Sequence, residues 1–331
     1  LIVPSVGAFY SSQFSINSAG SGTSGHSLSF DGVGVNDYVS ISHSLTGNSI
    51  INISGADSSG TIMAYVKLNS TTDDRYQRII SKKENWSDAA GYELELNPSQ
   101  NIITFLAGND NYARGSFTPS SDWIQIAVTF NGNVANVYVN GVDVTIDGAI
   151  DAVTENTVPL WIGNVSGSSG EGATFNGNID EVAVWNDDLA SNEVTALYNS
   201  GNPISASTNY LYYTSSSNLK GYWQLNEGSG TYTTDGSGNG NPGTIYGANW
   251  STDIPGSSTT SSSGGDDDGS IELLTGSPES GVSGNEQGYP LNSYYHDVKH
   301  QSLYWASDLA DAGILSGSSI TGIKLKVNQT P

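Results

Sequence analysis

The sequence predicts an all-β fold: an antiparallel two-sheet jelly-roll sandwich with one short helix, followed by part of a second β-sandwich. Three observations predict this fold class. Short runs of alternating apolar and polar residues recur along the chain. Two Asn-Gly pairs separate such runs and favour hairpin turns. Aromatic residues make up 10% of the 331 residues, with 18 Tyr and 7 Trp, a composition typical of a folded chain rather than a disordered one.

The clearest strands lie in the middle of the chain. Residues 124–130 alternate with a period of two, and the pattern resumes after Asn131-Gly132 and again after Asn140-Gly141. Both central residues of a type I′ turn need positive φ, so each pair predicts a tight hairpin. Strands are predicted at residues 61–68, 75–81, 91–96, 102–106, 124–130, 134–139, 142–146, 159–162 and 178–185. Many short antiparallel strands at this spacing are typical of a sandwich or jelly roll.

One short helix is predicted after the last of these strands. Ser191 is expected to cap it, and Glu193 falls in its positive first turn. The residues that form its apolar stripe are Val194, Leu197 and Tyr198. Gly201 and Pro203 are expected to end it.

The composition divides the chain into four parts. Residues 1–205 are predicted to form the jelly roll, and residues 206–256 a β extension packed on it. Residues 257–269 are rich in Ser, Gly and Asp and are predicted to be a solvated linker. Residues 270–331 are predicted to be the N-terminal part of a second β-sandwich, because about 60 residues are marginal for an independent domain of this kind.

Charge and residue usage exclude several function classes. The 33 acidic residues against 10 basic ones give a net charge of −23, which argues against a nucleic-acid partner. No stretch approaches about 20 apolar residues, so no membrane insertion is expected. The absence of Cys excludes thiolate metal sites and cysteine nucleophiles. An acid-rich, Lys-poor chain is consistent with a secreted or extracellular protein on a bacterial cell surface, where cations screen its charge.

Several motifs, taken in order, resemble a known family. They are Ser-Leu-Ser-Phe-Asp-Gly at 27–32, Trp-Ile-Gln-Ile-Ala-Val-Thr-Phe at 123–130, Val-Tyr-Val-Asn-Gly at 137–141, Trp-Ile-Gly at 161–163 and Phe-Asn-Gly-Asn-Ile-Asp-Glu-Val at 175–182. Together they resemble the laminin G-like, pentraxin-like jelly rolls of the concanavalin A-like lectin/glucanase superfamily. The resemblance covers roughly residues 26–200 and implies an antiparallel jelly roll.

A second match lies after that domain. Residues 219–230, 235–239 and 243–247 resemble the first strands of the same family, which ordinarily come before the Phe-Asp-Gly motif. These strands are expected to pair with the open edge of the jelly roll in the same chain. Two alternatives stay open: a degenerate second module with its own packing, or strand exchange with a neighbouring molecule, which would build a homopolymer through residues 219–250. Further on, residues 289–323 resemble the start of β-sandwich modules found in Bacteroidetes-type secreted surface proteins.

The family resemblance implies a calcium site. It brings together the Asp of Phe-Asp-Gly and the Asp of the Gly-x-Ile-Asp strand, which here are Asp31 and Asp180. Backbone oxygens near Gly32 and Asn178, together with Asp37, would complete the oxygen ligands that Ca²⁺ requires. The alternative is that Asp31 and Asp180 bind backbone N–H groups in turns.

An enzyme is not expected. Glu93 and Glu95 share one face of a strand, but the Glu-x-Asp-x-x-Glu pattern of laminarinase-like relatives is missing, so a solvated strand face is predicted. His296 and His300, spaced four apart, are expected to form a surface pair rather than a zinc site.

Aromatic and basic residues on loop tips are the candidates for ligand binding. The loops are residues 73–76, 83–86 and 110–114, and the ligand-binding candidates on them are Tyr76, Trp86, Tyr112 and Arg114. Trp123, Trp161 and Trp185 lie in strand motifs and are expected to pack in the core. The predicted function is non-catalytic adhesion to a glycan or surface protein, supported by calcium. The alternatives are a filament or surface-layer subunit and an accessory domain of a larger polysaccharide-degrading enzyme.

Overall fold

The structure is a computed structural model that describes residues 25–32, 37–43, 59–85, 87–108, 110–165 and 174–256. All of these residues belong to one compact unit, Ala19–Thr259. The predicted linker at 257–269, the second sandwich at 270–331, His296 and His300 lie outside the described residues. Among the residues described, none of the helices has the length and apolar character needed to span a membrane.

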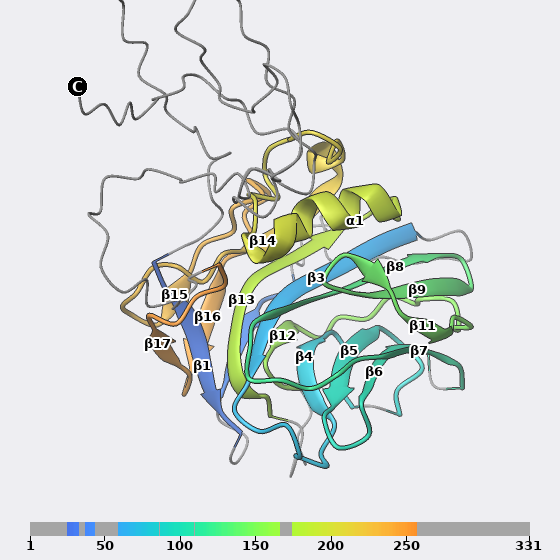
Figure 1. Ribbon diagram of the computed structural model, residues 1–331, viewed down its shortest axis with the longest axis horizontal. Helices are drawn as coiled ribbons and strands as arrows, with labels where there is room; N and C mark the ends of the chain where they lie inside the picture. The colour runs from blue at the N-terminus through green and yellow to red at the C-terminus, as the bar shows by residue number, and fades with distance from the viewer. Residues whose placement is uncertain are drawn as a thin grey trace, which may run out of the picture. The chain divides into compact units, whose positions relative to one another are not determined.

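Two antiparallel sheets and one short α-helix make up this unit, which confirms the predicted sandwich (Figure 1). The eight-stranded sheet contains β1 (Ser27–Asp31), β3 (Ser59–Leu68), β8 (Ile124–Asn131), β9 (Val134–Val139), β10 (Val142–Asp143), β13 (Asn176–Trp185), β14 (Leu219–Trp223) and β17 (Asn249–Ser251). The nine-stranded sheet contains β2 (Tyr38–Ile41), β4 (Gln77–Ser81), β5 (Tyr92–Asn97), β6 (Ile102–Ala107), β7 (Tyr112–Ser116), β11 (Thr145–Asp147), β12 (Leu160–Ile162), β15 (Tyr232–Thr233) and β16 (Gly243–Tyr246).

The strand orders place long-range neighbours side by side. The eight-stranded sheet runs β10-β9-β8-β3-β13-β1-β17, with β14 also paired to β13, and the nine-stranded sheet runs β11-β7-β6-β5-β4-β12-β2-β16-β15. The apolar core lies between the sheets and follows the predicted alternation, so that Ile126, Val128 and Phe130 of β8 are buried in it. Across the core, the ring of Phe130 stacks on that of Phe105 with centroids 5.2 Å apart.

The two Asn-Gly turns differ. Asn140 and Gly141 connect β9 to β10 with φ of 52° and 74°, as a type I′ turn requires. The loop between β8 and β9 is instead Gly132-Asn133. Of these two residues only Gly132 has a positive φ, 58°. The prediction of a type I′ turn at Asn131-Gly132 is therefore wrong. This pattern, with Gly first, is that of a type II′ turn. The predicted strand at 142–146 is also two strands, because β10 joins one sheet and β11 the other.

The predicted helix is α1 (Ser191–Tyr198). Ser191 is its first residue and not its cap, since Ala190 occupies that position without a side-chain hydrogen bond. The carboxylate of Glu193 accepts the backbone N–H of Ala190 at 3.2 Å instead, and thereby satisfies a donor at the start of the helix. Asn199 ends the helix in the left-handed conformation, before Gly201 is reached.

The strands of residues 219–251 pair within the same chain. β14 lies against the second half of β13, from Trp223 opposite Val182 to Leu219 opposite Trp185. β1 pairs with the first half of the same edge of β13. β13 has an irregularity between Asp180 and Ala183, which lies between the part paired with β1 and the part paired with β14. In the nine-stranded sheet β16 pairs with β2. In the eight-stranded sheet β17 pairs with β1. The extension therefore lengthens both sheets.

Candidate functional site

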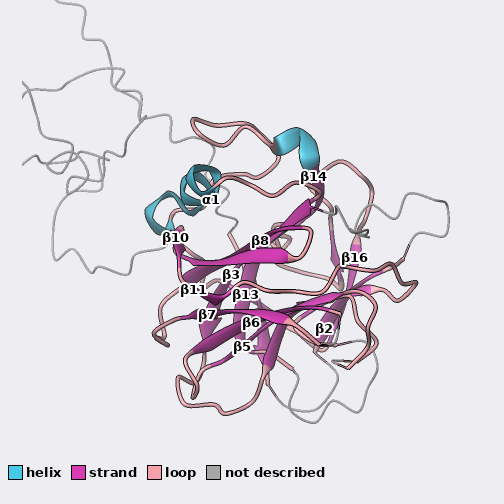
Figure 2. Ribbon diagram, turned by 90° about the vertical axis from the view of Figure 1, so that its right-hand side faces the viewer, coloured by secondary structure: helices cyan, strands magenta, loops and turns pink. Residues whose placement is uncertain are grey.

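The two sheets present different outer faces. The outer face of the eight-stranded sheet is covered by α1 and by the segment that follows it, as Figure 2 shows. The buried apolar residues packed there come from the sheet, the helix and residues 204–222: Met63, Ala127, Tyr138, Ala183, Trp185, Leu189, Val194, Leu197, Ile204, Ala206, Tyr213, Leu219 and Tyr222. This face is a second core rather than a binding surface.

The outer face of the nine-stranded sheet has a different composition. Residues directly opposite one another in a ladder project to the same face, so the registers define one row across eight strands. The row is Tyr232, Thr244, Ser40, Trp161, Ser81, Glu93, Leu106 and Tyr112. Four strand steps separate Trp161 from Tyr112, roughly 19 Å at ~4.8 Å per step, so the face is long enough for an extended ligand.

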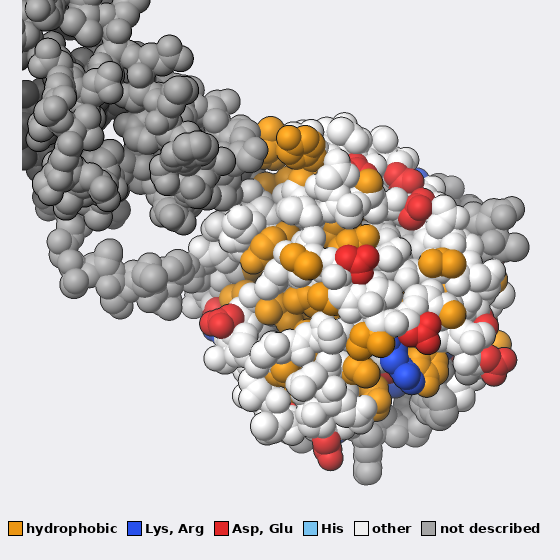
Figure 3. Space-filling view, turned by 45° about the vertical axis from the view of Figure 1, so that its right-hand side comes forward, with side chains coloured by type: hydrophobic (Ala, Val, Ile, Leu, Met, Phe, Trp, Pro, Cys, Tyr) orange, Lys and Arg blue, Asp and Glu red, His pale blue; other side chains and the backbone are white. Residues whose placement is uncertain are grey.

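Exposed tyrosines lie near both ends of this row. Tyr232 and Tyr246 at one end are 51% and 47% exposed, and Tyr112 at the other end is 36% exposed. Tyr76, just before β4, is 37% exposed, and its hydroxyl donates to Gln100 Oε1 at 3.0 Å. Figure 3 shows one side of the molecule, on which hydrophobic side chains are spread among polar ones, with a few acidic and basic side chains. Such surfaces offer ligands both apolar area and hydrogen-bonding groups.

Three aromatic rings form a stack at the β12–β2–β16 side. The ring of Tyr38 lies between Trp161, at 3.8 Å between centroids, and Tyr246, at 4.7 Å. Because both faces of the Tyr38 ring are covered, the outer ring of Tyr246 is the part of the stack most open to a ligand. Trp161 is therefore a half-buried member of this surface stack, and the prediction that it packs in the core is wrong. Trp123 is also half-buried, whereas Trp185 is in the core, as predicted.

A buried charged cluster lies in the middle of the same face. Arg78 Nε is 3.0 Å from Glu93 Oε1, and Arg78 Nη2 is 3.2 Å from Glu95 Oε2. Ser81 also donates to Glu93, at 2.7 Å. Glu93 and Glu95 are 0% and 5% exposed, so the predicted solvated strand face is wrong. Sequence reasoning missed it because Arg78 lies on the neighbouring strand, 15 residues from Glu93.

Burial and the adjacent Glu93 carboxylate raise the pKa of Glu95 to about 8, although Arg78 opposes this shift. Two carboxylates locked to one arginine are poorly placed for acid-base catalysis, since neither is accessible and Arg78 holds both. The cluster therefore supports the sheet beneath the exposed tyrosines rather than reacting with a ligand.

Two lysines close one end of this face. Lys83 Nζ donates to the carbonyl oxygens of Gly108, at 2.5 Å, and of Asp88. Lys82 Nζ donates to Val158 O at 2.7 Å and to Asn156 Oδ1 at 3.0 Å. Burial lowers the pKa of Lys82 to about 8. Both ammonium groups donate to oxygens of neighbouring loops, so neither Lys82 nor Lys83 is free to bind a ligand.

The predicted ligand-binding residues fall into two groups. Tyr112 and Arg114 lie on the outer face of the nine-stranded sheet and Tyr76 lies just before β4 of that sheet, whereas Trp86 is outside the described residues. Tyr112 and Arg114 belong to strand β7 and not to a loop tip, because this run pairs with β6. The guanidinium of Arg114 lies 4.4 Å above the ring of Tyr112, which fixes both side chains together.

The five predicted calcium ligands do not form one site. Asp31 is opposite Asn176 in the β1–β13 ladder, so Asp180 lies four residues further along β13, about 13 Å away at ~3.3 Å per residue. Asp180 is fully buried, and Asn178 Nδ2 donates to Ser27 Oγ at 3.0 Å. Only Asp31 and Asp37 meet, where Asp37 Oδ2 accepts the N–H of Asp31 at 3.0 Å. The Gly32 carbonyl accepts from Arg75 Nη1 at 2.5 Å. The described residues contain no group of three or more His, Asp or Glu side chains arranged to hold a metal ion.

Comparison with known proteins agrees with this architecture. Residues 33–195 match a laminin G family model described as the concanavalin A-like lectin/glucanases superfamily. Residues 33–195 are thus similar to this family, and the two-sheet sandwich is the fold that this similarity implies. None of the curated proteins matches the chain.

Solved structures similar to this chain come from several organisms. A candidate carbohydrate-binding protein of Bacteroides ovatus superposes with a TM-score of 0.51 at 18% identity, over 70% of this chain and 60% of its own. The chain thus spans about 60% of that protein's length. A heptameric SAP-like pentraxin of Limulus polyphemus has a TM-score of 0.38 and 16% identity, covering 52% of this chain and 81% of its own. A CBM40 of the Ruminococcus gnavus IT-sialidase, bound to α2,3-sialyllactose, has a TM-score of 0.40 and 14% identity, covering 53% of this chain and 99% of its own.

Proposed function

We propose that this domain binds a glycan, without catalysis, on the outer face of the nine-stranded sheet. The observation that carries the proposal is the set of exposed tyrosines on that face, Tyr112, Tyr232 and Tyr246, together with Tyr76 just before β4. A sugar ring has an apolar face and a polar edge, which match the ring and the hydroxyl of tyrosine. The likeness in fold to a candidate carbohydrate-binding protein of Bacteroides ovatus is consistent with this role.

The extension contributes to the proposed site. Tyr232 and Tyr246 belong to β15 and β16, which reach this face only because β16 pairs with β2. The filament alternative would use the same strands to join neighbouring molecules, but here β14 pairs with β13 and β16 pairs with β2 within the chain. A binding domain also suits the role of accessory domain in a larger enzyme. We propose that it acts outside the cell, on a bacterial surface, in keeping with its acid-rich, cysteine-free composition.

A glycan array followed by calorimetry tests the proposal. We expect Tyr112→Ala and Tyr246→Ala each to weaken binding to a retained glycan roughly fivefold, since a lost ring contact is worth about 1 kcal/mol. Tyr212→Ala is the matched control, because Tyr212 is 63% exposed but lies in the segment beyond α1. Retention of no glycan, or an equal loss in Tyr212→Ala, would contradict the proposal.

A further inference from the structure

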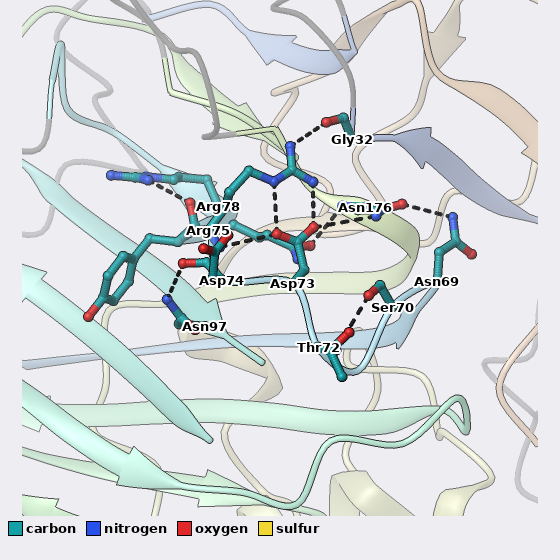
Figure 4. Close-up of polar contacts among 12 residues, drawn as sticks. Gly32, Asn69, Ser70, Thr72, Asp73, Asp74, Arg75, Arg78, Asn97 and Asn176 are labelled. Atoms are coloured by element: carbon teal, nitrogen blue, oxygen red, sulfur yellow. Dashed lines mark hydrogen bonds and ion pairs between the residues drawn. The ribbon is translucent and has the colours of Figure 1, made fainter. Parts of the chain in front are cut away.

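A charged contact joins three segments at one rim of the sandwich, around the loop between β3 and β4. Within the loop, Arg75 and Asp73 form a bidentate pair, with Nε–Oδ1 at 2.8 Å and Nη2–Oδ2 at 2.5 Å (Figure 4). The backbone N–H of Arg75 also donates to Asp73 Oδ1, at 3.1 Å. Side-on pairs of this kind combine charge with fixed geometry.

The same guanidinium reaches the end of β1. Arg75 Nη1 donates to the carbonyl of Gly32 at 2.5 Å, across 43 residues of sequence. Gly32 has φ of +70°, and a Cβ there would lie 2.6 Å from Asn176 Cβ and 3.2 Å from Arg75 Nη2. The backbone of Gly32 can approach the guanidinium only because this residue has no side chain.

The third segment is the start of β13. Asn176 Nδ2 faces Asp73 Oδ2 at 3.5 Å, and Asn176 Oδ1 accepts from Asn69 Nδ2 at 3.2 Å. The backbone N–H of Asn176 donates to Gln77 Oε1 at 2.8 Å, which ties this point to β4. Arg75 thus contacts oxygens of Asp73 in the β3–β4 loop and of Gly32 at the end of β1, and Asn176 of β13 donates to the same carboxylate.

These oxygens, a carboxylate and a backbone carbonyl, belong to the set that Ca²⁺ uses. We infer that the Arg75 guanidinium is the cation that holds this rim together, in the role that a bound divalent ion would otherwise have, and that folding of the domain does not depend on calcium. Arg75 also lowers the pKa of Asp73, which keeps the carboxylate charged. The inference is independent of glycan binding, since none of these residues belongs to the proposed ligand face.

Melting curves with millimolar calcium chloride or with a chelator test this inference. We expect the Tm of the wild-type protein to be the same in both. Arg75→Ala should melt about 5 °C lower in chelator, because Asp73 loses its partner, and should recover part of this loss in calcium. Arg75→Lys keeps the charge but not the bidentate contact, so its Tm in chelator should lie between those of the wild type and Arg75→Ala. This variant provides a readout should Arg75→Ala not fold.

Arg114→Ala is the control, because it removes an arginine that is half-buried like Arg75 but lies in β7 and contacts Tyr112 rather than Asp73. Its Tm should be close to that of the wild type in both solutions. A wild-type Tm that rises with calcium by several degrees would overturn the inference. So would an Arg75→Ala variant that melts like Arg114→Ala.

Discussion

The two outer faces of the sandwich differ in what covers them. The eight-stranded sheet carries α1 and residues 204–222, and its aromatic residues are sealed there, with Trp185 Nε1 donating to Tyr213 Oη at 2.9 Å. The nine-stranded sheet carries exposed tyrosines around a buried charged cluster. The same strand alternation produces both faces, so the alternation alone does not tell a second core from a ligand surface.

Buried polar groups on the two faces also follow different rules. On the covered face, Tyr222 donates to the Glu181 carboxylate, which is fully buried at the irregularity of β13. On the open face, Arg78 pairs with Glu93 and Glu95. Burial raises the pKa of both Glu181 and Glu95 to about 8 and so favours the neutral acid on both faces, but only the open face places a cation beside its acids.

Truncating one tryptophan on each face gives the largest expected difference. Trp185→Ala should lower the free energy of unfolding by about 3–5 kcal/mol, because Trp185 is fully buried beneath α1. Trp161→Ala should cost less than half of this, since Trp161 is half-buried and loses mainly its stack on Tyr38. Urea denaturation followed by circular dichroism measures both. Equal losses would mean that the open face is as closely packed as the covered one.

Removing the cation from the charged cluster comes next. Arg78→Ala should destabilise the domain by roughly 3 kcal/mol, because it leaves Glu93 and Glu95 buried without a counter-charge. Arg114→Ala, on the same sheet face, should change stability by less than about 1 kcal/mol. The same urea titrations compare them. Should Arg78→Ala prove as stable as Arg114→Ala, the cluster would not be what holds this face together.

A pH dependence of stability is also expected from the covered face, and per pH unit it is smaller than the effects of the two substitutions above. Burial raises the pKa of Glu181 from its usual 4.5 to about 8. The folded state therefore holds a proton that the unfolded state has lost above pH 4.5, so this contribution is complete below that pH and fades as pH rises through about 8. It amounts to on the order of 1 kcal/mol per pH unit in this window.

Glu181→Gln keeps the acceptor for Tyr222 but removes the titration. Its free energy of unfolding should therefore fall less steeply than that of the wild type between pH 5 and pH 8, measured by denaturation at several pH values. The pKa of Glu95 is also raised to about 8, so some slope should remain in this variant. Parallel profiles for the variant and the wild type would show that Glu181 is ionised in the folded state.

Local sequence determined the elements of this protein. Alternation predicted β8 and β9, positive-φ residues predicted the turn at Asn140-Gly141, and an apolar stripe predicted α1. These features depend on backbone preferences and on neighbours a few residues apart, which a sequence displays directly. The resemblance in residues 219–250 also pointed to strands that belong with the jelly roll.

Only the tertiary structure decided what the faces do. Glu93 is buried because Arg78 lies on the next strand, Trp161 is at the surface because its neighbour is Tyr38, and Gly32 contacts Arg75 across 43 residues. The separation of Asp31 from Asp180 likewise follows from the register of one ladder. Such contacts join residues far apart in the chain. The environment of a side chain therefore depends on strand order and register, which local residue preferences do not encode.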